Sequence, residues 1–373
     1  MLLMLIYCNI SLIDRRISLC EYCYDRYMKE FLTLSPLTRG DQVAVISPSN
    51  GLPQLFPEVF ELGLSRLRDE FGLIQKEYPT TRVMGAPLRD RARDIMAAFA
   101  DPENKAVFTS IGGEDQIQLI KFLDAEVIRS NPKPFIGFSD NTHLHLYLWN
   151  LGIPSYYGGA VMTQFGMQGQ MDEMTVGSIR KALFEHGTYA ISASEQYNDV
   201  GLDWSDPSLL SKRRKYETND GLFWDGEGKV EGILWGGCVE SLIFQSTVGN
   251  YLPDASELEG TVLFIETAED IPEPWIVKYL LAGFGERGWF DKFQAVLVGR
   301  PKAWEFDKQN SAEQKAVYRA AQRDSVVQTI RQYNATIPIV QNLDFGHTDP
   351  QLLVPMGRRV MVDANNHTLS FNY

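Results

Sequence analysis

The sequence predicts an α/β protein with a parallel-sheet N-terminal part and a smaller, mixed α/β C-terminal part. Three observations support this fold class. Short β-rich runs alternate with amphipathic stretches over residues 42–183, a polar and irregular stretch follows at 187–228, and strands and helices resume after residue 230. Strands that alternate with helices predict a parallel sheet with helices on both faces. A chain of 373 residues is also long for one domain, since domains commonly have about 150 residues.

In the N-terminal part, buried strands are expected at residues 42–47, 106–110 and 134–137. Helices are expected at 55–71, 89–99, from about Glu114, and at 141–150. Functional groups in such sheets gather at the carboxyl ends of the strands. Gly113 and Ser139 both stand at such ends.

In the C-terminal part, strands are expected at 231–237, 261–267, 293–299 and 337–342, followed by three short closing strands. Helices are expected from Val239 and at 272–284 and 312–333. We therefore divide the chain into a non-core extension (1–33), an α/β domain (34–186), a linker or lid with two tryptophans (187–228) and a C-terminal domain (229–373).

Composition excludes several classes of protein. The formal net charge is -13 and no Lys- or Arg-rich run is present, which argues against a nucleic-acid partner. The first 13 residues are apolar, but they are too short to span a bilayer and lack the basic start of a signal peptide. We expect no membrane partner and read these residues as an extension ahead of a start near Met28. A signal peptide is the alternative.

The four cysteines are few for so long a chain and fit a reducing cytoplasm. Three of them lie within the first 23 residues, where they cannot crosslink the rest of the protein. Cys20-x-x-Cys23 is compatible with a zinc or redox site. A second ligand pair or a βαβ setting, which such sites require, is missing.

Ser139 lies in the segment PFIGFSDNT, between an expected strand and the start of a helix. A serine at such a turn exposes its hydroxyl, and the amide of Asp140 faces the same space, so a nucleophile and an oxyanion donor come together. The G-x-S-x-G motif is not met, because Asn141 occupies its last position. The alternative is that Ser139 caps the helix. Gly112 and Gly113 suit an oxyanion hole or a plain tight turn, since the nucleotide-binding glycine motifs are absent.

A nucleophilic serine needs a base, and the chain has five histidines. His347 follows a strand in the polar segment NLDFGHTDP, and Glu266 ends the expected strand at 261–267, where it can orient a histidine. His143 is a rival base, although its side chain would point along its helix. His143-x-His145 could bind a metal, but no third ligand is evident. Glu266 could equally be a solvent-exposed carboxylate.

Eight segments in a fixed order resemble the LD-carboxypeptidase family of serine peptidases, which includes the microcin C immunity peptidases. They lie between Leu37 and Asp363 and read GDQVAVISPS, SIGGEDQIQLIKFLD, NPKPFIGFSDNTHLHLYL, GIPSYYGGAVMTQFG, VEGILWGGCVESL, VLFIETAE, VLVGRP and DFGHTDPQLLVPMG. The resemblance implies a flavodoxin-like N-terminal domain, a smaller C-terminal domain, a site at their junction and a homodimer.

The same resemblance implies a triad of Ser139, Glu266 and His347, with oxyanion donors at the amide of Asp140 and at Gly112-Gly113. One departure is Cys238, which stands where many members have Asn after the second Gly of a GG motif. That replacement puts a substrate contact in doubt. We take Trp224 and Glu240 as candidate substrate-binding residues; packing under the linker is the alternative for Trp224. The long junction looks more like the microcin-immunity branch than the shorter murein enzymes.

The predicted function is a metal-independent serine carboxypeptidase that needs no organic cofactor and acts in the cytoplasm. Ser139 attacks an amide, His347 takes its proton, Glu266 steadies the imidazolium, and water releases the acyl group. The substrate is a murein LD-tetrapeptide or a microcin C-like aminoacyl-nucleotide. The competing hypothesis is a non-catalytic small-ligand or nucleotide-binding α/β protein, because fold alone does not determine function.

Overall fold

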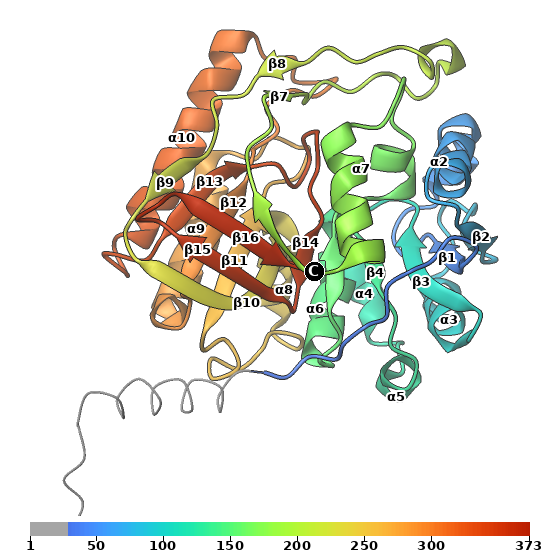
Figure 1. Cartoon of the computed structure of the whole chain (residues 1–373), viewed down its shortest axis with the longest axis horizontal. Helices are drawn as coiled ribbons and strands as arrows, with labels where there is room; N and C mark the ends of the chain where they lie inside the picture. Colours follow the sequence, from blue (N-terminus) through green and yellow to red (C-terminus); the bar gives the residue numbers. More distant parts are fainter. Residues whose placement is uncertain (1–28) are drawn as a thin grey trace, which may run out of the picture.

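The computed structural model describes residues 29–373, which form two α/β units built on two large sheets (Figure 1). The first sheet has the strand order β14-β5-β4-β3-β1-β2, and β1 to β5 run parallel. Its strands are β1 (Gln42–Ile46), β2 (Ile74–Glu77), β3 (Asn104–Thr109), β4 (Phe135–Gly137), β5 (Ser155–Tyr157) and β14 (Val354–Met356). The order β2-β1-β3-β4-β5 is that of flavodoxin-like sheets. The predicted fold class is therefore confirmed.

Helices cover both faces of this sheet because its side chains alternate between the faces. Val43 and Val45 of β1 belong to the hydrophobic cluster that includes α2, whereas Ala44 and Ile46 belong to a second cluster with the helices of the other face. The helices of this unit are α2 (Pro57–Asp69), α3 (Leu88–Ala100), α4 (Gln116–Ile120), α5 (Ala125–Arg129), α6 (Thr142–Asn150) and α7 (Glu173–Arg180). The helix expected from about Glu114 begins two residues later and is short.

The second sheet has the order β6-β16-β15-β10-β11-β12-β13-β9. Its four central strands, β10 to β13, run parallel, and the outer strands pair antiparallel. The strands are β6 (Thr188–Ile191), β9 (Phe223–Asp225), β10 (Lys229–Cys238), β11 (Thr261–Glu266), β12 (Ala295–Gly299), β13 (Ile339–Leu343), β15 (Arg359–Asp363) and β16 (Thr368–Asn372). The accompanying helices are α8 (Val239–Val248), α9 (Pro274–Glu286) and α10 (Ala312–Ile330).

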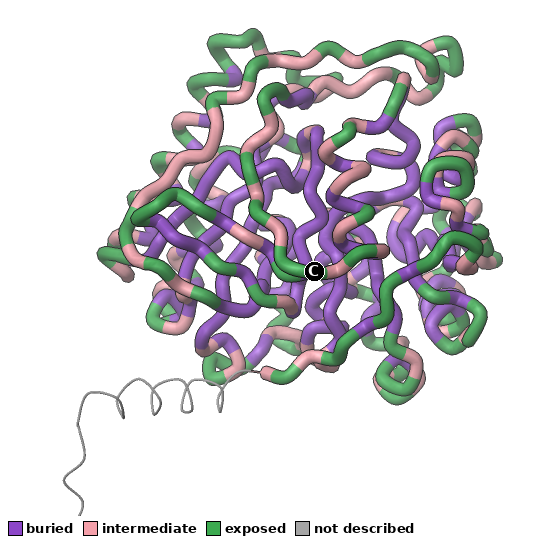
Figure 2. Tube along the Cα trace, in the orientation of Figure 1, coloured by how far each residue is buried: buried purple, intermediate pink, exposed green. Residues whose placement is uncertain are grey.

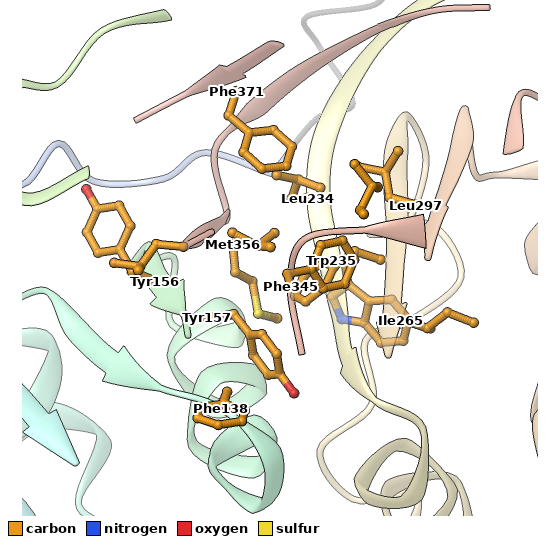
Figure 3. Close-up of a cluster of buried hydrophobic side chains, with 14 of the residues drawn as sticks. Phe138, Tyr156, Tyr157, Leu234, Trp235, Ile265, Leu297, Phe345, Met356 and Phe371 are labelled. Carbon is orange, nitrogen blue, oxygen red and sulfur yellow. The ribbon is translucent and has the colours of Figure 1, made fainter. Parts of the chain in front are cut away.

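A strand from the C-terminal part completes the first sheet, and the two units share one core. β14 comes from the C-terminal part of the chain yet pairs with β5 of the first sheet, and β6 pairs with β16 of the second. Buried residues, purple in Figure 2, fill the interior of both units. The shared cluster includes Tyr156 and Tyr157 of β5, Met356 of β14, and Leu234 and Trp235 of β10 (Figure 3). This common core fixes the relative position of the strand ends that carry the candidate site.

Residues 187–228 contain more regular structure than their polar sequence suggests. Besides β6 and β9, they form the two-stranded pair β7 (Gln196–Tyr197) and β8 (Glu217–Thr218), which lies near α10 at the top of Figure 1. Asp199 anchors the pair to α10, because its carboxylate binds Lys315 at 2.6 Å and also pairs with Arg319. These strands have only two to four residues, too short for a periodic pattern.

Residues 29–33, which we placed in the extension, contact both units. Lys29 pairs with Glu257 at 2.5 Å, and the ring of Phe31 packs edge-on against Trp149. The Cys20-x-x-Cys23 pair and Cys8 lie outside the described residues. Over residues 29–373, no helix combines the length and apolarity needed to cross a membrane. No three His, Cys, Asp or Glu side chains of this described part are grouped as a metal site.

Candidate active site

Ser139 occupies a strained turn directly after β4. Its φ is +63°, in the left-handed region that non-glycine residues rarely adopt. Gly137, two residues earlier, has no room for a side chain, because a Cβ there would lie 2.5 Å from Oγ1 of Thr109. The carbonyl of Ser139 accepts a hydrogen bond of 2.7 Å from Oγ1 of Thr142. Backbone strain of this kind is typical of a nucleophile turn, in which the hydroxyl points away from the sheet.

Gly112, Gly113 and Asp140 line the space beside this hydroxyl. A Cβ on Gly112 would lie 3.2 Å from Oγ of Ser139 and 3.4 Å from the amide nitrogen of Asp140. Within residues 29–373 the amide of Gly113 has no hydrogen-bond acceptor. The space next to Ser139 thus exists because residue 112 has no side chain, and amide donors border it. This geometry is compatible with an oxyanion hole.

Asp140 contributes its amide to this space while its side chain is buried. Its Oδ2 accepts from the amide of Gln116 at 3.1 Å, and its Oδ1 lies 3.4 Å from Nε2 of His143. Burial raises the pKa of Asp140 to about 6. Gln116 also binds Asn141 at 2.8 Å and thereby holds the Gly112-Gly113 loop against the turn.

Glu266 and His347 meet at the end of the second sheet. Nδ1 of His347 donates to Oε2 of Glu266 over 2.7 Å, and the Glu266 side chain is fully buried. Gly346 permits this approach, because a Cβ at that position would lie 2.5 Å from the same Oε2. The imidazole packs against the ring of Phe138, the residue before Ser139, at 5.0 Å. The structure thus brings the three predicted triad residues to one place.

Tyr157 connects the two sheets at this place, and the sequence analysis missed it. Its hydroxyl accepts from the amide of Ser139 at 3.0 Å and donates to Oε1 of Glu266 at 2.5 Å. Burial and the charge of Glu266 raise the pKa of Tyr157 well above its usual value, so the hydroxyl stays protonated. The only available signal was its position at a strand end in the segment GIPSYYGG.

His347 has a second carboxylate partner, Glu269, which was also missed. Nε2 of His347 lies 2.9 Å from Oε2 of Glu269. Burial alone would lower the pKa of His347, but the charges of Glu266 and Glu269 outweigh burial and raise it well above 6.5. The side chain of Glu269 is half exposed, but the packed neighbours of its carboxylate displace water and oppose ionisation. The charge and hydrogen bond of His347 nevertheless lower the pKa of Glu269 to about 2. Within the described residues, Oγ of Ser139 forms no hydrogen bond with His347, a contact that often tightens only in complexes with substrate.

Cys238 and Glu240 lie under the site. The thiol of Cys238 donates to Oε2 of Glu240 at 3.1 Å, and the same oxygen accepts from the amide of Ala268 at 3.1 Å. Burial raises the pKa of Cys238 well above its usual value, which makes it a poor nucleophile. The contacts of Glu240 support the loop after β11 that carries Glu269. Its role in substrate binding stays a prediction.

Within the described residues, the remaining candidates His143, His145 and Trp224 form no hydrogen bond or ring contact with Glu266 or His347. His145 is fixed between Oγ of Ser155 at 2.7 Å and the carbonyl of Gly137 at 2.8 Å, and burial lowers its pKa to about 4. Burial likewise lowers the pKa of His143 to about 3. Both rings are therefore neutral packing groups. Trp224 stacks on His367, in the turn between β15 and β16, at 5.1 Å and 13°. No aromatic contact joins it to the predicted triad.

Fold and site together define an α/β protein with a candidate Ser-Glu-His centre between two sheets. Residues 43–158 match the family model described as the LD-carboxypeptidase N-terminal domain, and residues 231–362 match the LD-carboxypeptidase C-terminal domain. The two matches cover more than half of the chain. The protein therefore belongs to the LD-carboxypeptidase family.

Curated relatives match almost the whole chain. The microcin C7 self-immunity protein MccF of Escherichia coli is 27% identical over 347 residues, which cover 91% of this chain and 95% of the relative. A probable murein peptide carboxypeptidase of Bacillus subtilis is 26% identical and covers 89% of this chain and 92% of its own. The chain thus resembles proteins that are named for two different substrates.

Solved structures support the same fold. An MccF-like protein from Streptococcus pneumoniae in complex with AMP has a TM-score of 0.78 at 27% identity, covering 89% of this chain and 99% of that chain. MccF in complex with aspartyl sulfamoyl adenosine has a TM-score of 0.79 at 24% identity, covering 92% and 98%. The latter likeness establishes the two-domain fold.

Proposed function

We propose that the protein is a metal-independent serine hydrolase that cleaves a terminal amide of a small peptide-like substrate through an acyl-enzyme. The observation that carries the proposal is the junction itself. Ser139 has a left-handed backbone, and His347 is paired with the buried carboxylate of Glu266. The two sides meet where the ring of Phe138, the residue before Ser139, packs against His347. Membership of the LD-carboxypeptidase family supports hydrolase activity.

In the proposed reaction, Oγ of Ser139 attacks the amide carbonyl and its proton passes to Nε2 of His347. Glu266 holds Nδ1–H and stabilises the imidazolium. The amides of Asp140 and Gly113 bind the oxyanion of the tetrahedral intermediate. The C–N bond then breaks as Nε2 returns the proton to the leaving amine, and water, activated by His347, hydrolyses the ester.

For the substrate we keep both predicted classes, a murein LD-tetrapeptide and a microcin C-like aminoacyl-nucleotide. The names of the relatives include both, and MccF binds aminoacyl sulfamoyl nucleosides. A homodimer and a cytoplasmic location likewise stay predictions.

The test compares the two substrates side by side with the purified full chain and includes a fluorophosphonate probe of reactive serines. We expect hydrolysis of at least one substrate and labelling of the wild-type protein at Ser139. Labelling should vanish in Ser139→Ala and persist in Ser241→Ala, whose hydroxyl is the nearby control at 3.4 Å from the carbonyl of Ser139. Labelling elsewhere, or full activity of Ser139→Ala, would contradict the proposal.

A further inference from the structure

Both ring nitrogens of His347 have a carboxylate partner. Nδ1 binds Glu266 at 2.7 Å and Nε2 binds Glu269 at 2.9 Å. Ionised carboxylates only accept hydrogen bonds, so both ring nitrogens must carry a proton. A doubly protonated imidazole cannot take the proton of Ser139. With both carboxylate contacts in place, His347 is therefore in a resting state of the proposed base.

The two carboxylates differ in their freedom to move. The side chain of Glu266 is fully buried and is also held by Tyr157, whereas the side chain of Glu269 is 52% exposed. Glu269 stands three residues after Glu266, in the loop whose Ala268 amide is bound by Glu240. The backbone of the loop is thus fixed, but the Glu269 side chain reaches solvent. Glu269 can leave His347 by a change of rotamer, and Glu266 cannot.

We propose that Glu269 is a positioning residue that holds His347 in the resting state, and that a cationic amino group of the substrate, close to the scissile amide, binds Glu269 and frees Nε2. The proposal rests on the hydrolase function proposed above. Beyond that function, it names the substrate group that releases the base, a cationic amine. The freed Nε2 can then lose its proton to solvent and serve Ser139.

The charges around Glu269 explain why the displacing group is a cation. The pKa of the neighbouring Asp270 is raised by burial and then by the negative charges of Glu269, Glu114 and Asp307, while the charge of His347 opposes this rise. The positive charge of Lys302 lowers the pKa of Glu269, but the ammonium of Lys302 is already paired with Glu305. A carboxylate that leaves His347 therefore remains in acidic surroundings. An ammonium group compensates its charge, whereas an anionic group is repelled.

The first experiment measures the protonation of His347 without any substrate. The groups that face His347 are Glu266, Glu269, Asp270 and the ring of Phe138. Glu269→Gln removes one charge and preserves the shape. NMR of ¹⁵N-labelled histidine in the full chain, with the signal assigned by His347→Asn, should show the His347 midpoint about 1 to 3 pH units lower in Glu269→Gln.

The matched control is Glu273→Gln, four residues further along the same segment. Glu273 lies 3.7 Å from Lys308 and does not contact His347. Its substitution should leave the midpoint of His347 unchanged. Equal midpoints in the wild type and in Glu269→Gln would overturn the resting state.

The second experiment compares a substrate that has a free amino group with its N-acetylated analogue. The wild type should prefer the free amine in kcat/KM, and Glu269→Gln should reduce this preference about tenfold, the usual size of one charged hydrogen bond. The acid limb of the Glu269→Gln profile should also move to lower pH. An unchanged preference for the amine would overturn the role of the cation.

Failure of the proposed function is distinguishable from failure of this inference. If the wild type cleaves no amide and the probe does not label Ser139, the hydrolase function is wrong, whatever the NMR midpoint. If the wild type is active and labelled, but Glu269→Gln changes neither the midpoint nor the amine preference, the inference alone is wrong.

Discussion

The turn that carries Ser139 and the strand end that carries Glu266 position their side chains by different means. Ser139 is fixed through its backbone. Its φ is left-handed, its amide donates a hydrogen bond to the hydroxyl of Tyr157, and its carbonyl accepts one from the hydroxyl of Thr142. His347 is fixed by charge, since both ring nitrogens contact carboxylates. Neither of the two hydrogen bonds that fix Ser139 involves an ionised group, whereas the contacts of His347 depend on the protonation of its ring. We therefore expect the nucleophile to respond to backbone changes and the base to respond to pH.

The largest effect is expected from the nucleophile itself. Ser139→Ala should lower kcat by about 10³-fold or more, because the covalent step is lost, while the protein still folds. Ser139→Gly should be equally inactive but more stable than Ser139→Ala by about 1 kcal/mol, since glycine adopts the left-handed region without strain. Urea unfolding and steady-state kinetics measure the two quantities. Equal stability of the two variants would show that the turn is not strained.

A side chain at Gly112 tests the space next to the nucleophile. Gly112→Ala places a Cβ 3.0 Å from Cβ of Ser139 and 3.2 Å from its Oγ, so the hydroxyl must shift. We expect kcat to fall by about 10²-fold, the usual cost of a misplaced reacting group. Gly177→Ala is the control, because nothing lies within 4 Å of a Cβ at that helical position. Full activity of Gly112→Ala would mean that the reaction does not use this space.

The base should make activity dependent on pH in one direction. Two carboxylates raise the pKa of His347 well above 6.5 despite its burial, and a base must be neutral to act. In the wild type, kcat/KM should therefore rise with pH, by about tenfold per unit below that pKa. The stabilisation that His347 contributes has the opposite dependence. It is complete below pH 6.5 and is lost as pH rises through the folded-state pKa. A flat profile between pH 6 and 8 would contradict this description.

Tyr157 connects the two sides of the comparison, so its hydroxyl should affect both. Tyr157→Phe removes the bonds to Ser139 and Glu266 and should lower kcat about tenfold and stability by about 1–2 kcal/mol. Tyr156→Phe is the matched control, since the ring of Tyr156 packs near Tyr373 and not against Ser139 or Glu266. Kinetics and urea unfolding of both variants test this. The same loss of kcat in both would show that the effect is general to β5.

The smallest effect is expected at Trp224. Its stacking on His367 and its place in β9 beside β13 favour a packing role, so Trp224→Ala should lower Tm by a few degrees. Under this role KM for an aminoacyl sulfamoyl adenylate and for a murein tetrapeptide should change little. Trp204→Ala is the comparison, because Trp204 packs on Phe56 at 5.6 Å. A rise in KM for the adenylate alone, with Tm unchanged, would instead support the nucleotide-binding hypothesis.

The sequence by itself determined the α/β fold class, most strands and helices, and the positions of Ser139, Glu266 and His347 at strand ends. These features follow from local patterns, because buried parallel strands are continuous apolar runs and functional groups collect where such strands end. Ser139 was also predicted at a sharp turn, but its backbone strain was not visible in the residue order.

Only the tertiary structure decided which side chains meet. Tyr157 bridges Ser139 and Glu266 because β5 lies beside β4 and faces β11 across the shared core, and β14 crosses into the first sheet to complete it. Glu269 looks like any exposed acid in the sequence, and its contact with His347 arises where two loops converge at one edge of a sheet. Such contacts join residues far apart in the chain. No local pattern encodes them. The packing of the two sheets brings Tyr157 to Glu266, and the convergence of two loops of the second sheet brings Glu269 to His347.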